Sequence, residues 1–242
     1  MSVERPVVVV IPTFGEAANI PELLLRMAEL PDARRWRALI VDDDSGDGIA
    51  LALARLPPLP LEVALVRREG PKGRGRAGRE GFQLALDGGA ELIVEMDGDG
   101  SHDPADIPRL IAATEDCDAA FGSRFVAGGS DGERILSRKI FTRLANLFVR
   151  AVLGIPLLDP NSGFRCYRRA ALEAIGAASL RSQDCEIVQE TAWRLSRRGL
   201  RIREIPVDFH ERRSGKTTKT LRDVRNCFWT TLLLRLQGVG RP

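Results

Sequence analysis

The sequence predicts an α/β domain built on a mostly parallel sheet flanked by helices. Short apolar runs alternate with segments of helical periodicity through the first half of the chain. Runs of this kind that are rich in Val and Ile are typical of buried parallel strands, and the segments between them supply the crossover helices. Three of the runs end in polar or acidic segments. Parallel strands would bring these ends together at one edge of the sheet, where ligands bind in open α/β folds.

The composition agrees with this fold class. The chain has 242 residues, of which 44% are hydrophobic and 29% charged, and this suits one large domain with a sizeable core. A net charge of +3 does not mark the whole molecule as a polyanion binder. The four cysteines are widely spaced and there are two histidines, so we expect neither a zinc site nor a disulfide framework, and a reducing compartment. The first strand begins within six residues, which leaves no room for a signal peptide, and no apolar run approaches the ~18 residues of a spanning helix.

The expected strands and helices alternate along the first half of the chain. Strands are predicted at residues 7–11, 38–41, 63–66, 92–96 and 119–122. Helical spacing of apolar residues predicts helices over 20–27, 49–56, 82–86 and 107–114, with a glycine- and arginine-rich loop over 67–81. This alternation predicts helices on both faces of the sheet.

The pattern changes after about residue 125. We predict a long helix over 134–153, a loop and short strand within 156–169, a helix over 183–198, a strand near 202–207 and a final helix from 221. We therefore divide the chain into a main domain, residues 1–219, and a C-terminal amphipathic helix, residues 220–242.

The most informative stretch is the acidic motif at residues 95–104, which follows the fourth strand. Asp97 and Asp99 stand at alternate positions with Gly98 between them. Two carboxylates placed so at a strand end suit a hard cation held against a phosphate. The alternative is an acidic loop that only caps the next helix, since Asp103 before Pro104 is a good helix start signal.

A second acidic segment, residues 42–45, follows the second strand. Carboxylates here can accept hydrogen bonds from a nucleobase or a ribose. The alternative is a helix N-cap, in which Ser45 or Asp47 accepts backbone N–H bonds.

Residues 67–81 contain six Arg or Lys and two Glu. Residues 73–78 formally match G-x-G-x-x-G, but this match is weak because the first strand–helix turn of the chain lacks these glycines. A basic loop beside a phosphate site is one interpretation, and a solvated basic loop is the other. An RNA-binding segment is disfavoured because no aromatic residues interleave with the arginines.

Further basic groups lie later in the chain. Arg124 ends the fifth strand and could form a bidentate pair with a phosphate, or a structural ion pair with a nearby aspartate. The basic loop at 212–219 is a second candidate phosphate clamp. The helices at 134–153 and 220–237 each combine an apolar face with Arg or Lys edges. Such helices either lie in a membrane interface or pack on the sheet in the ordinary way.

Taken together, these motifs resemble the family 2 glycosyltransferases, and within them the polyprenol- and dolichol-phosphate mannosyltransferases. The motifs occur in the order typical of that family at residues 10–16, 41–45, 96–102, 122–125, 162–165 and 205–207, followed by the basic loop. The resemblance implies a GT-A fold with a nucleotide-sugar donor, most simply GDP-mannose, and a polyprenyl phosphate acceptor. It also implies Mg²⁺ or Mn²⁺ as cofactor. We therefore expect an enzyme on the cytoplasmic face of a membrane that is peripherally bound and binds no nucleic acid, and a separate membrane-anchoring subunit is left open.

The resemblance also implies roles for individual residues. The nucleotide sugar would be held by Pro12, Phe14, Glu16, Asp42, Asp44, Asp97 and Gly98. Asp97 and Asp99 would hold the metal, with Ser101 as a further candidate ligand, while His102 either joins the metal or shapes the loop. Asp99 and Arg124 would be catalytic, and phosphate would be bound by Arg124, Arg212, Lys216 and Lys219.

This sequence departs from the family pattern at two points. Gly15 stands where the family usually has Asn. The basic loop is one residue longer before its second lysine, so whether Lys216 or Lys219 takes the role of the family lysine stays open.

The chemistry implied by the resemblance needs no general base. A phosphate monoester has a second pKa near ~6, so the acceptor is already a nucleophilic anion at neutral pH. It would attack the anomeric carbon opposite the leaving group and invert it. A soluble transferase with a glycan acceptor would instead need a carboxylate base, for which Asp184, Glu186 and Glu190 are candidates. An RNA-binding module and a dinucleotide oxidoreductase are the more distant alternatives.

Overall fold

The computed structural model describes residues 6–132, 134–211 and 221–237. Its centre is a seven-stranded sheet with the order β3-β2-β1-β4-β6-β5-β7. The strands are β1 Val7–Thr13, β2 Trp36–Asp42, β3 Glu62–Arg67, β4 Leu92–Glu95, β5 Ala119–Ser123, β6 Arg165–Arg168 and β7 Ile202–Pro206. The α-helices are α1 Ile20–Ala28, α2 Ile49–Ala54, α3 Arg74–Asp87, α4 Ile107–Ala113, α5 Leu136–Leu153, α6 Arg169–Ala174, α7 Ile187–Arg197 and α8 Leu221–Gln237. The predicted α/β class, with a mostly parallel sheet, is confirmed.

Strand β6 runs antiparallel to both of its neighbours, β4 and β5, while the other strand pairs are parallel. Glu95 at the end of β4 pairs with Arg165 at the start of β6. The loop that precedes β6 therefore lies at the same sheet edge as the loop that follows β4. In this way the sheet brings residues 159–164 next to the acidic motif, although about sixty positions separate them in the sequence.

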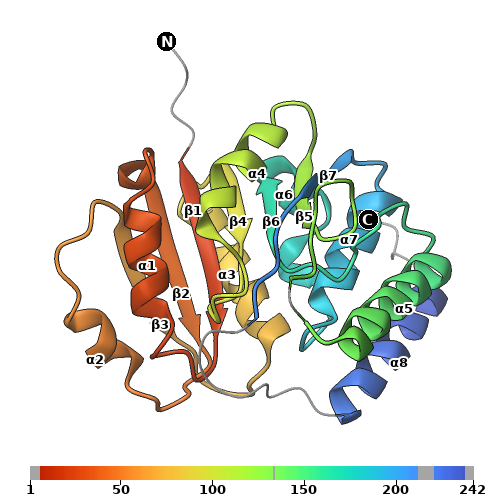
Figure 1. Ribbon diagram of the computed structural model, residues 1–242, viewed down its shortest axis with the longest axis horizontal. Helices are drawn as coiled ribbons and strands as arrows, with labels where there is room; N and C mark the ends of the chain where they lie inside the picture. Colours follow the sequence, from red (N-terminus) through yellow and green to blue (C-terminus); the bar gives the residue numbers. More distant parts are fainter. Residues whose placement is uncertain (1–5, 133, 212–220, 238–242) are drawn as a thin grey trace.

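The sheet is covered on both faces, as Figure 1 shows. Alternate residues of β1 point to opposite sides, so Val8 and Val10 join a core with α3 and α7. Val9 and Ile11 join a second core with α1 and α4. This alternation is why a continuous apolar run forms a strand that is buried on both faces.

The region predicted as a glycine- and arginine-rich loop is largely helical, so that prediction was wrong. Helix α3 begins at Arg74 and carries Gly75, Gly78 and Gly81 at helical spacing. A Cβ on Gly81 would lie 2.3 Å from Cγ1 of Val10, and one on Gly75 would lie 2.7 Å from the carbonyl oxygen of Asp184. Gly81 thus allows the helix to approach the sheet closely, and Gly75 allows it to approach the backbone of the loop before α7. This close packing offsets the lower helix propensity of glycine, which costs about 1 kcal/mol per residue relative to alanine.

Helices α5 and α8 lie side by side beyond the end of the sheet (Figure 1). The rings of Phe148 and Phe228 join them, with centroids 4.5 Å apart. The apolar face predicted for α5 points outward: the exposed fractions are 49% for Ile140, 59% for Leu144 and 58% for Leu147. Among the described helices, none is long and apolar enough to cross a bilayer.

Candidate active site

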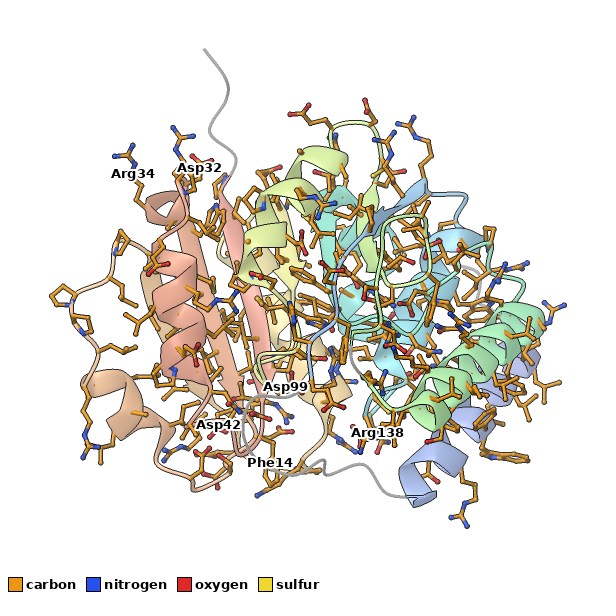
Figure 2. The ribbon with its side chains drawn as sticks, viewed as in Figure 1. Phe14, Asp32, Arg34, Asp42, Asp99 and Arg138 are labelled. Carbon is orange, nitrogen blue, oxygen red and sulfur yellow. The ribbon has the colours of Figure 1, made fainter. Side chains whose placement is uncertain are left out.

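Two cavities meet at the acidic motif. One, of about 390 Å³, is polar, and the other, of about 300 Å³, is largely apolar. Asp97, Asp99 and Cys185 line both of them. Figure 2 shows Phe14, Asp42 and Asp99 gathered at the sheet edge where β1, β2 and β4 end. The predicted convergence of the polar strand ends at one edge is therefore present.

The polar cavity is bordered by the segment that follows β1. Pro12, Phe14 and Glu16 all line it, together with Gly98. The ring of Phe14 is 45% exposed, and the ammonium of Lys72 lies 4.8 Å from its centroid. These residues thus offer an aromatic face beside a cation, which suits the base and phosphates of a nucleotide.

A buried hydroxyl in the polar cavity has no partner in the described structure. Thr13 is 4% exposed, and its Oγ1 makes no hydrogen bond within the described residues. Since buried polar groups are nearly always hydrogen-bonded, this hydroxyl marks a place where a ligand atom is expected.

The two aspartates of the motif are held by their own loop. The backbone N–H of Asp97 donates to Nδ1 of His102 at 3.1 Å, and Oδ1 of Asp99 accepts from the N–H of Ser101 at 3.0 Å. Gly98 between them has no room for a side chain, because a Cβ would lie 2.9 Å from Cδ1 of Ile20. The loop therefore fixes the backbone of Asp97 and the carboxylate of Asp99.

His102 supports the motif from behind. Its ring stacks on Phe164 with centroids 4.9 Å apart and an interplanar angle of 11°. Burial lowers the pKa of His102, although Asp97 and Asp99 act to raise it. Nδ1 of His102 is occupied by the backbone N–H of Asp97, and through this bond the ring supports the loop. A contact of His102 with the metal stays a prediction.

Arg74 and Glu95 contact the acidic motif, and the sequence analysis gave neither of them a role there. Arg74 donates from Nη2 and Nε to Oδ1 of Asp97 at 2.7 and 3.0 Å, and from Nη1 to Oε1 of Glu95 at 3.1 Å. Burial would lower the pKa of Arg74, but Asp97 and Glu95 outweigh it and raise the value. The signal in the sequence was a lone glutamate at the end of the otherwise apolar β4.

The aspartates after β2 are placed differently from the roles expected for them. The carboxylate of Asp42 accepts from the hydroxyl of Ser45 at 2.9 Å, and Asp44 is exposed. Asp47, one of the two residues expected to accept backbone N–H bonds, accepts the N–H of Ile49 at the start of α2 at 3.1 Å. Asp43 is the member that lines the polar cavity, and its Oδ2 accepts the N–H of Gly73 at 2.6 Å. A direct contact of Asp42 or Asp44 with the nucleotide stays a prediction.

The basic residues at 67–81 are largely paired within the protein. Arg68 is buried between Asp43 and Glu80, and Arg74 binds Glu95 and Asp97. These two arginines are therefore not the solvated side chains of a free basic loop.

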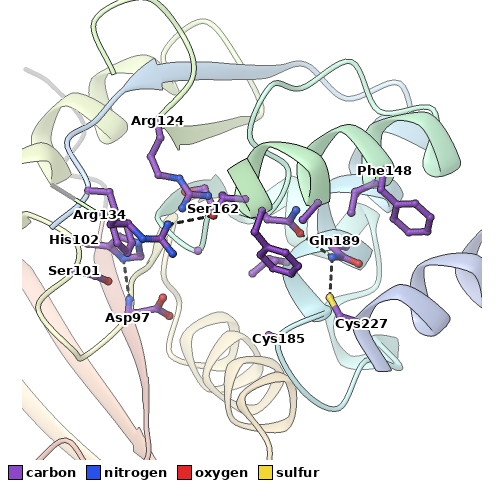
Figure 3. A pocket seen from close by; sticks show the side chains of 18 of the residues that line it. Asp97, Ser101, His102, Arg124, Arg134, Phe148, Ser162, Cys185, Gln189 and Cys227 are labelled. Atoms are coloured by element: carbon purple, nitrogen blue, oxygen red, sulfur yellow. Dashed lines mark hydrogen bonds between the residues drawn. The ribbon is translucent and has the colours of Figure 1, made fainter. Parts of the chain in front are cut away.

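The apolar cavity runs from the acidic motif to α5 and α8, as Figure 3 shows. Its walls include Phe141, Phe148 and Phe228 from the two helices. Arg124 and Arg134 line the end nearest Asp97. A ligand here would have an apolar tail and an anionic head.

Arg124 is held in a structural ion pair, which was the alternative to phosphate binding. Its Nε and Nη2 donate to Oδ2 and Oδ1 of Asp159, each at 2.7 Å. Burial acts to lower the pKa of Arg124, but the hydrogen bonds and charge of Asp159 raise it. An arginine has five N–H donors, so this pair does not exhaust its capacity to bind an anion. Arg134, which the sequence analysis did not single out, donates to Asp131 at 3.0 Å.

The remaining predicted phosphate-binding residues, Arg212, Lys216 and Lys219, lie outside the described residues. Ser101 lines the apolar cavity, and its carbonyl oxygen accepts from the N–H of His210.

Comparison with known sequences assigns this arrangement to a family. The family model described as glycosyl transferase family 2 matches residues 8–176. This chain belongs to glycosyl transferase family 2. Strands β2 to β6, nearly all of β1, the acidic motif and the loop before β6 fall within the matched residues, whereas β7 lies beyond them.

Two relatives resemble this family 2 glycosyltransferase over most of its length. The undecaprenyl-phosphate mannosyltransferase of Micrococcus luteus is 36% identical, covering 87% of this chain and 86% of the relative. The polyprenol monophosphomannose synthase of Mycolicibacterium smegmatis is 33% identical, covering 95% and 87%.

Solved structures share the fold of this glycosyltransferase. Glucosyl-3-phosphoglycerate synthase from Mycobacterium tuberculosis, in complex with Mn²⁺ and UDP-glucose, gives a TM-score of 0.69 at 19% identity, covering 98% of this chain and 80% of that one. The complex of that enzyme with UDP alone also gives 0.69, at 17% identity, covering 98% and 81%. The likeness identifies the GT-A fold, as the resemblance implied.

Proposed function

We propose that this glycosyltransferase moves a mannosyl group from GDP-mannose to a polyprenyl monophosphate at a membrane surface. The observation that carries the proposal is the meeting of a polar and an apolar cavity at Asp97 and Asp99. The two relatives, which are named for mannosyl transfer to undecaprenyl phosphate and for polyprenol monophosphomannose synthesis, support the sugar and the acceptor.

The donor would occupy the polar cavity. Phe14 would stack against the base, while Pro12 and Glu16 border the nucleoside. Lys72 lies beside Phe14, where its charge would meet the diphosphate. The unpartnered hydroxyl of Thr13 would acquire a hydrogen bond from the donor.

The residues of the motif fit a divalent cation, Mg²⁺ or Mn²⁺. Asp97 and Asp99 would hold it, and Ser101 stays a candidate ligand. The described residues contain no group of three His, Cys, Asp or Glu side chains that could hold a metal on their own. Two carboxylates plus substrate phosphates are nevertheless a usual cradle for such an ion. When bound, it would supply Lewis-acid stabilisation of the diphosphate leaving group.

The acceptor would place its phosphate at the junction of the cavities and its isoprenoid tail along α5 and α8. Arg124 and Arg134 would bind and orient the phosphate, so that two anions can approach each other. Of the described residues that line the apolar cavity, the acidic ones are Asp97 and Asp99. This suits an acceptor that is already ionised and needs no base.

The transfer would proceed by a single displacement. A phosphate oxygen attacks the anomeric carbon from the side opposite the diphosphate, which inverts the configuration. The guanidinium of Arg74 fixes Asp97 in place, and the aromatic walls exclude water that would otherwise hydrolyse the donor.

The outer face of α5 supports placement at a membrane. Ile140, Leu144 and Leu147 are exposed on one side of the helix, with Lys139 and Arg143 nearby in the sequence. An apolar face with cationic edges suits the boundary between headgroups and acyl chains.

The glycan-acceptor alternative has less support. Of its three candidate bases, Glu190 is buried and accepts the N–H groups of Arg181 and Ser182 and an ion pair from Arg194. Asp184 lines the polar cavity on the donor side. Glu186 accepts the N–H of Gln183 at 3.4 Å. None of the three carboxylates lines the apolar cavity, so none is placed to take a proton from an acceptor there.

Calorimetric titration with GDP-mannose, GDP-glucose, UDP-glucose and UDP-mannose, each with and without Mn²⁺, tests the donor. We expect GDP-mannose to bind tightest and its affinity to depend on the metal. Equal binding of the four donors, or binding that ignores Mn²⁺, would count against the proposed donor site.

A further inference from the structure

A continuous chain of hydrogen bonds connects Arg124 to helix α8 along the apolar cavity. Asp159 accepts from Arg124 and, through Oδ1, from Nδ2 of Asn146 on α5 at 2.9 Å. Oδ1 of Asn146 accepts from Nδ2 of Asn161 at 2.7 Å. Oδ1 of Asn161 accepts from Nε2 of Gln189 on α7, also at 2.7 Å.

The last link is a hydroxyl on α8. Oγ1 of Thr231 lies 2.5 Å from Oε1 of Gln189 and 2.7 Å from the carbonyl oxygen of Cys227. The hydroxyl has one proton for these two acceptor oxygens, and we place it on the shorter contact, to Gln189. Nε2 of Gln189 also contacts Sγ of Cys227 at 3.0 Å (Figure 3).

The direction of the chain is dictated by its carboxylate end. An ionised Asp159 can only accept, so Asn146 must turn its NH₂ toward Asp159 and its oxygen toward Asn161. The same constraint passes to Asn161 and then to Gln189, whose oxygen faces α8. Every donor therefore points toward Asp159, and aligned bonds of this kind strengthen one another in a buried setting.

Burial makes most of the links costly to break, although Asn161 is only half-buried. The exposed fractions are 0% for Asp159, 2% for Asn146, 2% for Gln189 and 0% for Thr231. A buried donor or acceptor that loses its partner keeps its full desolvation cost, so the side chains shift to recover one. A displacement of α8 would consequently be felt at Asp159, whose two oxygens orient Arg124.

We propose that Gln189 and Thr231 are positioning residues that couple the seating of α8 to the orientation of Arg124. The inference rests on the proposed function, because it gives Arg124 an anionic acceptor to hold. Helix α8 forms part of the cavity wall that the isoprenoid tail would touch. A tail seated between α5 and α8 would thus favour the arrangement in which Arg124 faces the phosphate.

The coupling can be measured by the binding of farnesyl phosphate, a water-soluble prenyl monophosphate, in calorimetry. Thr231→Val keeps the shape of the side chain and removes the donor, and we expect a roughly fivefold weaker affinity, within the range of such couplings. Thr231→Ser should restore it. Thr114→Val is the matched control, since that buried hydroxyl bonds to the carbonyl oxygen of Ile111 at the end of α4, away from the cavity.

A double variant separates coupling from two local effects. Asn146→Leu and Thr231→Val alter side chains that do not touch, yet either one breaks the chain. We expect the affinity of the double variant for farnesyl phosphate to equal that of whichever single variant binds it less tightly. The affinity for GDP should be unchanged in all three variants. The coupling would be overturned if the fold-losses of affinity of the two single variants multiply in the double variant. It would also be overturned if Thr231→Val binds farnesyl phosphate as tightly as Thr114→Val does. Either result would leave the proposed function standing. Failure of the unaltered protein to bind farnesyl phosphate would overturn the proposed acceptor, and with it the coupling.

Discussion

The two cavities differ in how the chain builds them. The polar cavity is lined mostly by the ends of strands β1, β2 and β4 and the residues that follow them. Residues 72–74 at the start of α3 and residues 184–185 before α7 complete it. The apolar cavity takes its walls from α5, α7, α8 and the loop before β6, which come from widely separated parts of the sequence. The comparison shows that a site at strand ends can be located from short motifs. A site between helices depends on how those helices pack.

Charge is handled differently in the two regions as well. Beside the polar cavity, Arg74 and Arg68 are each bound by two carboxylates in the immediate surroundings. Beside the apolar cavity, Arg124 is bound by Asp159, and its Nη1 lies 3.6 Å from a carboxylate oxygen of Asp131. Here the described hydrogen bonds continue from Asp159 through a relay of amides to α8, so the acceptor side can respond to that helix.

The largest effect is expected where the two cavities meet. Asp99→Asn keeps the shape of the side chain and removes its charge, so we expect transfer to fall by roughly 10³-fold, with an unchanged melting temperature. Steady-state transfer assays and circular dichroism would measure both.

Asp103→Asn is the matched control for this variant. Asp103 is on the same loop, but its Oδ1 accepts from Arg26 and from the N–H of Ala105. We expect a small loss of stability and nearly normal transfer. Similar losses of transfer in both variants would show that the loop, and not the charge at Asp99, is what matters.

The second effect concerns the outer face of α5. Leu144→Glu combined with Leu147→Glu should weaken binding to anionic vesicles by on the order of 10- to 100-fold, because two apolar side chains would lose their burial in the bilayer. Co-sedimentation with vesicles measures this directly.

Leu51→Glu on α2 serves as the control for exposure. Leu51 is 58% exposed, like the two leucines of α5. Helix α2, however, lies near the opposite edge of the sheet from α5 (Figure 1). Vesicle binding that drops equally with Leu51→Glu would argue against α5 as the membrane-facing element.

The smallest effect concerns the packing of α3 against the sheet. Gly81→Ala should destabilise the protein by about 1–3 kcal/mol, because the new Cβ would lie 2.3 Å from Cγ1 of Val10. Gly78→Ala, one turn earlier, meets its nearest atom at 3.4 Å and should be neutral or stabilising, since Ala is the better helix former. Chemical denaturation of both variants tests the difference, and equal stabilities would contradict the tight packing of α3.

The sequence was sufficient for the parallel strands and for the acidic motif, because both are local patterns. The apolar composition of residues 7–11 was enough to predict a buried strand. Asp97 and Asp99 were enough to predict a charged segment at the end of a strand. The antiparallel direction of β6 could not be read in this way, because a four-residue strand carries no mark of its partner. Helix α3 was misread because glycine favours loops locally, and only the nearness of Val10 explains its use in a helix.

The ion pairs were the other feature beyond the reach of local patterns. Arg124 and Asp159 are 35 positions apart, and β6 is the element that brings the loop of Asp159 to the end of β5. Glu95 could have been noticed as a lone acid in an apolar strand, yet its partner Arg74 precedes it by 21 positions. Such pairs depend on the order of the strands in the sheet, so they could not be predicted from short sequence motifs.

The most direct test of the two-cavity account compares polyprenyl phosphate with the free polyprenol of equal chain length as acceptors of mannose from GDP-mannose. Both have the tail that the apolar cavity would hold, but only the phosphate is an ionised nucleophile for Arg124 and Arg134 to orient. The account predicts mannosyl transfer to the phosphate and none to the alcohol. Equal transfer to both, or transfer to neither, would contradict it.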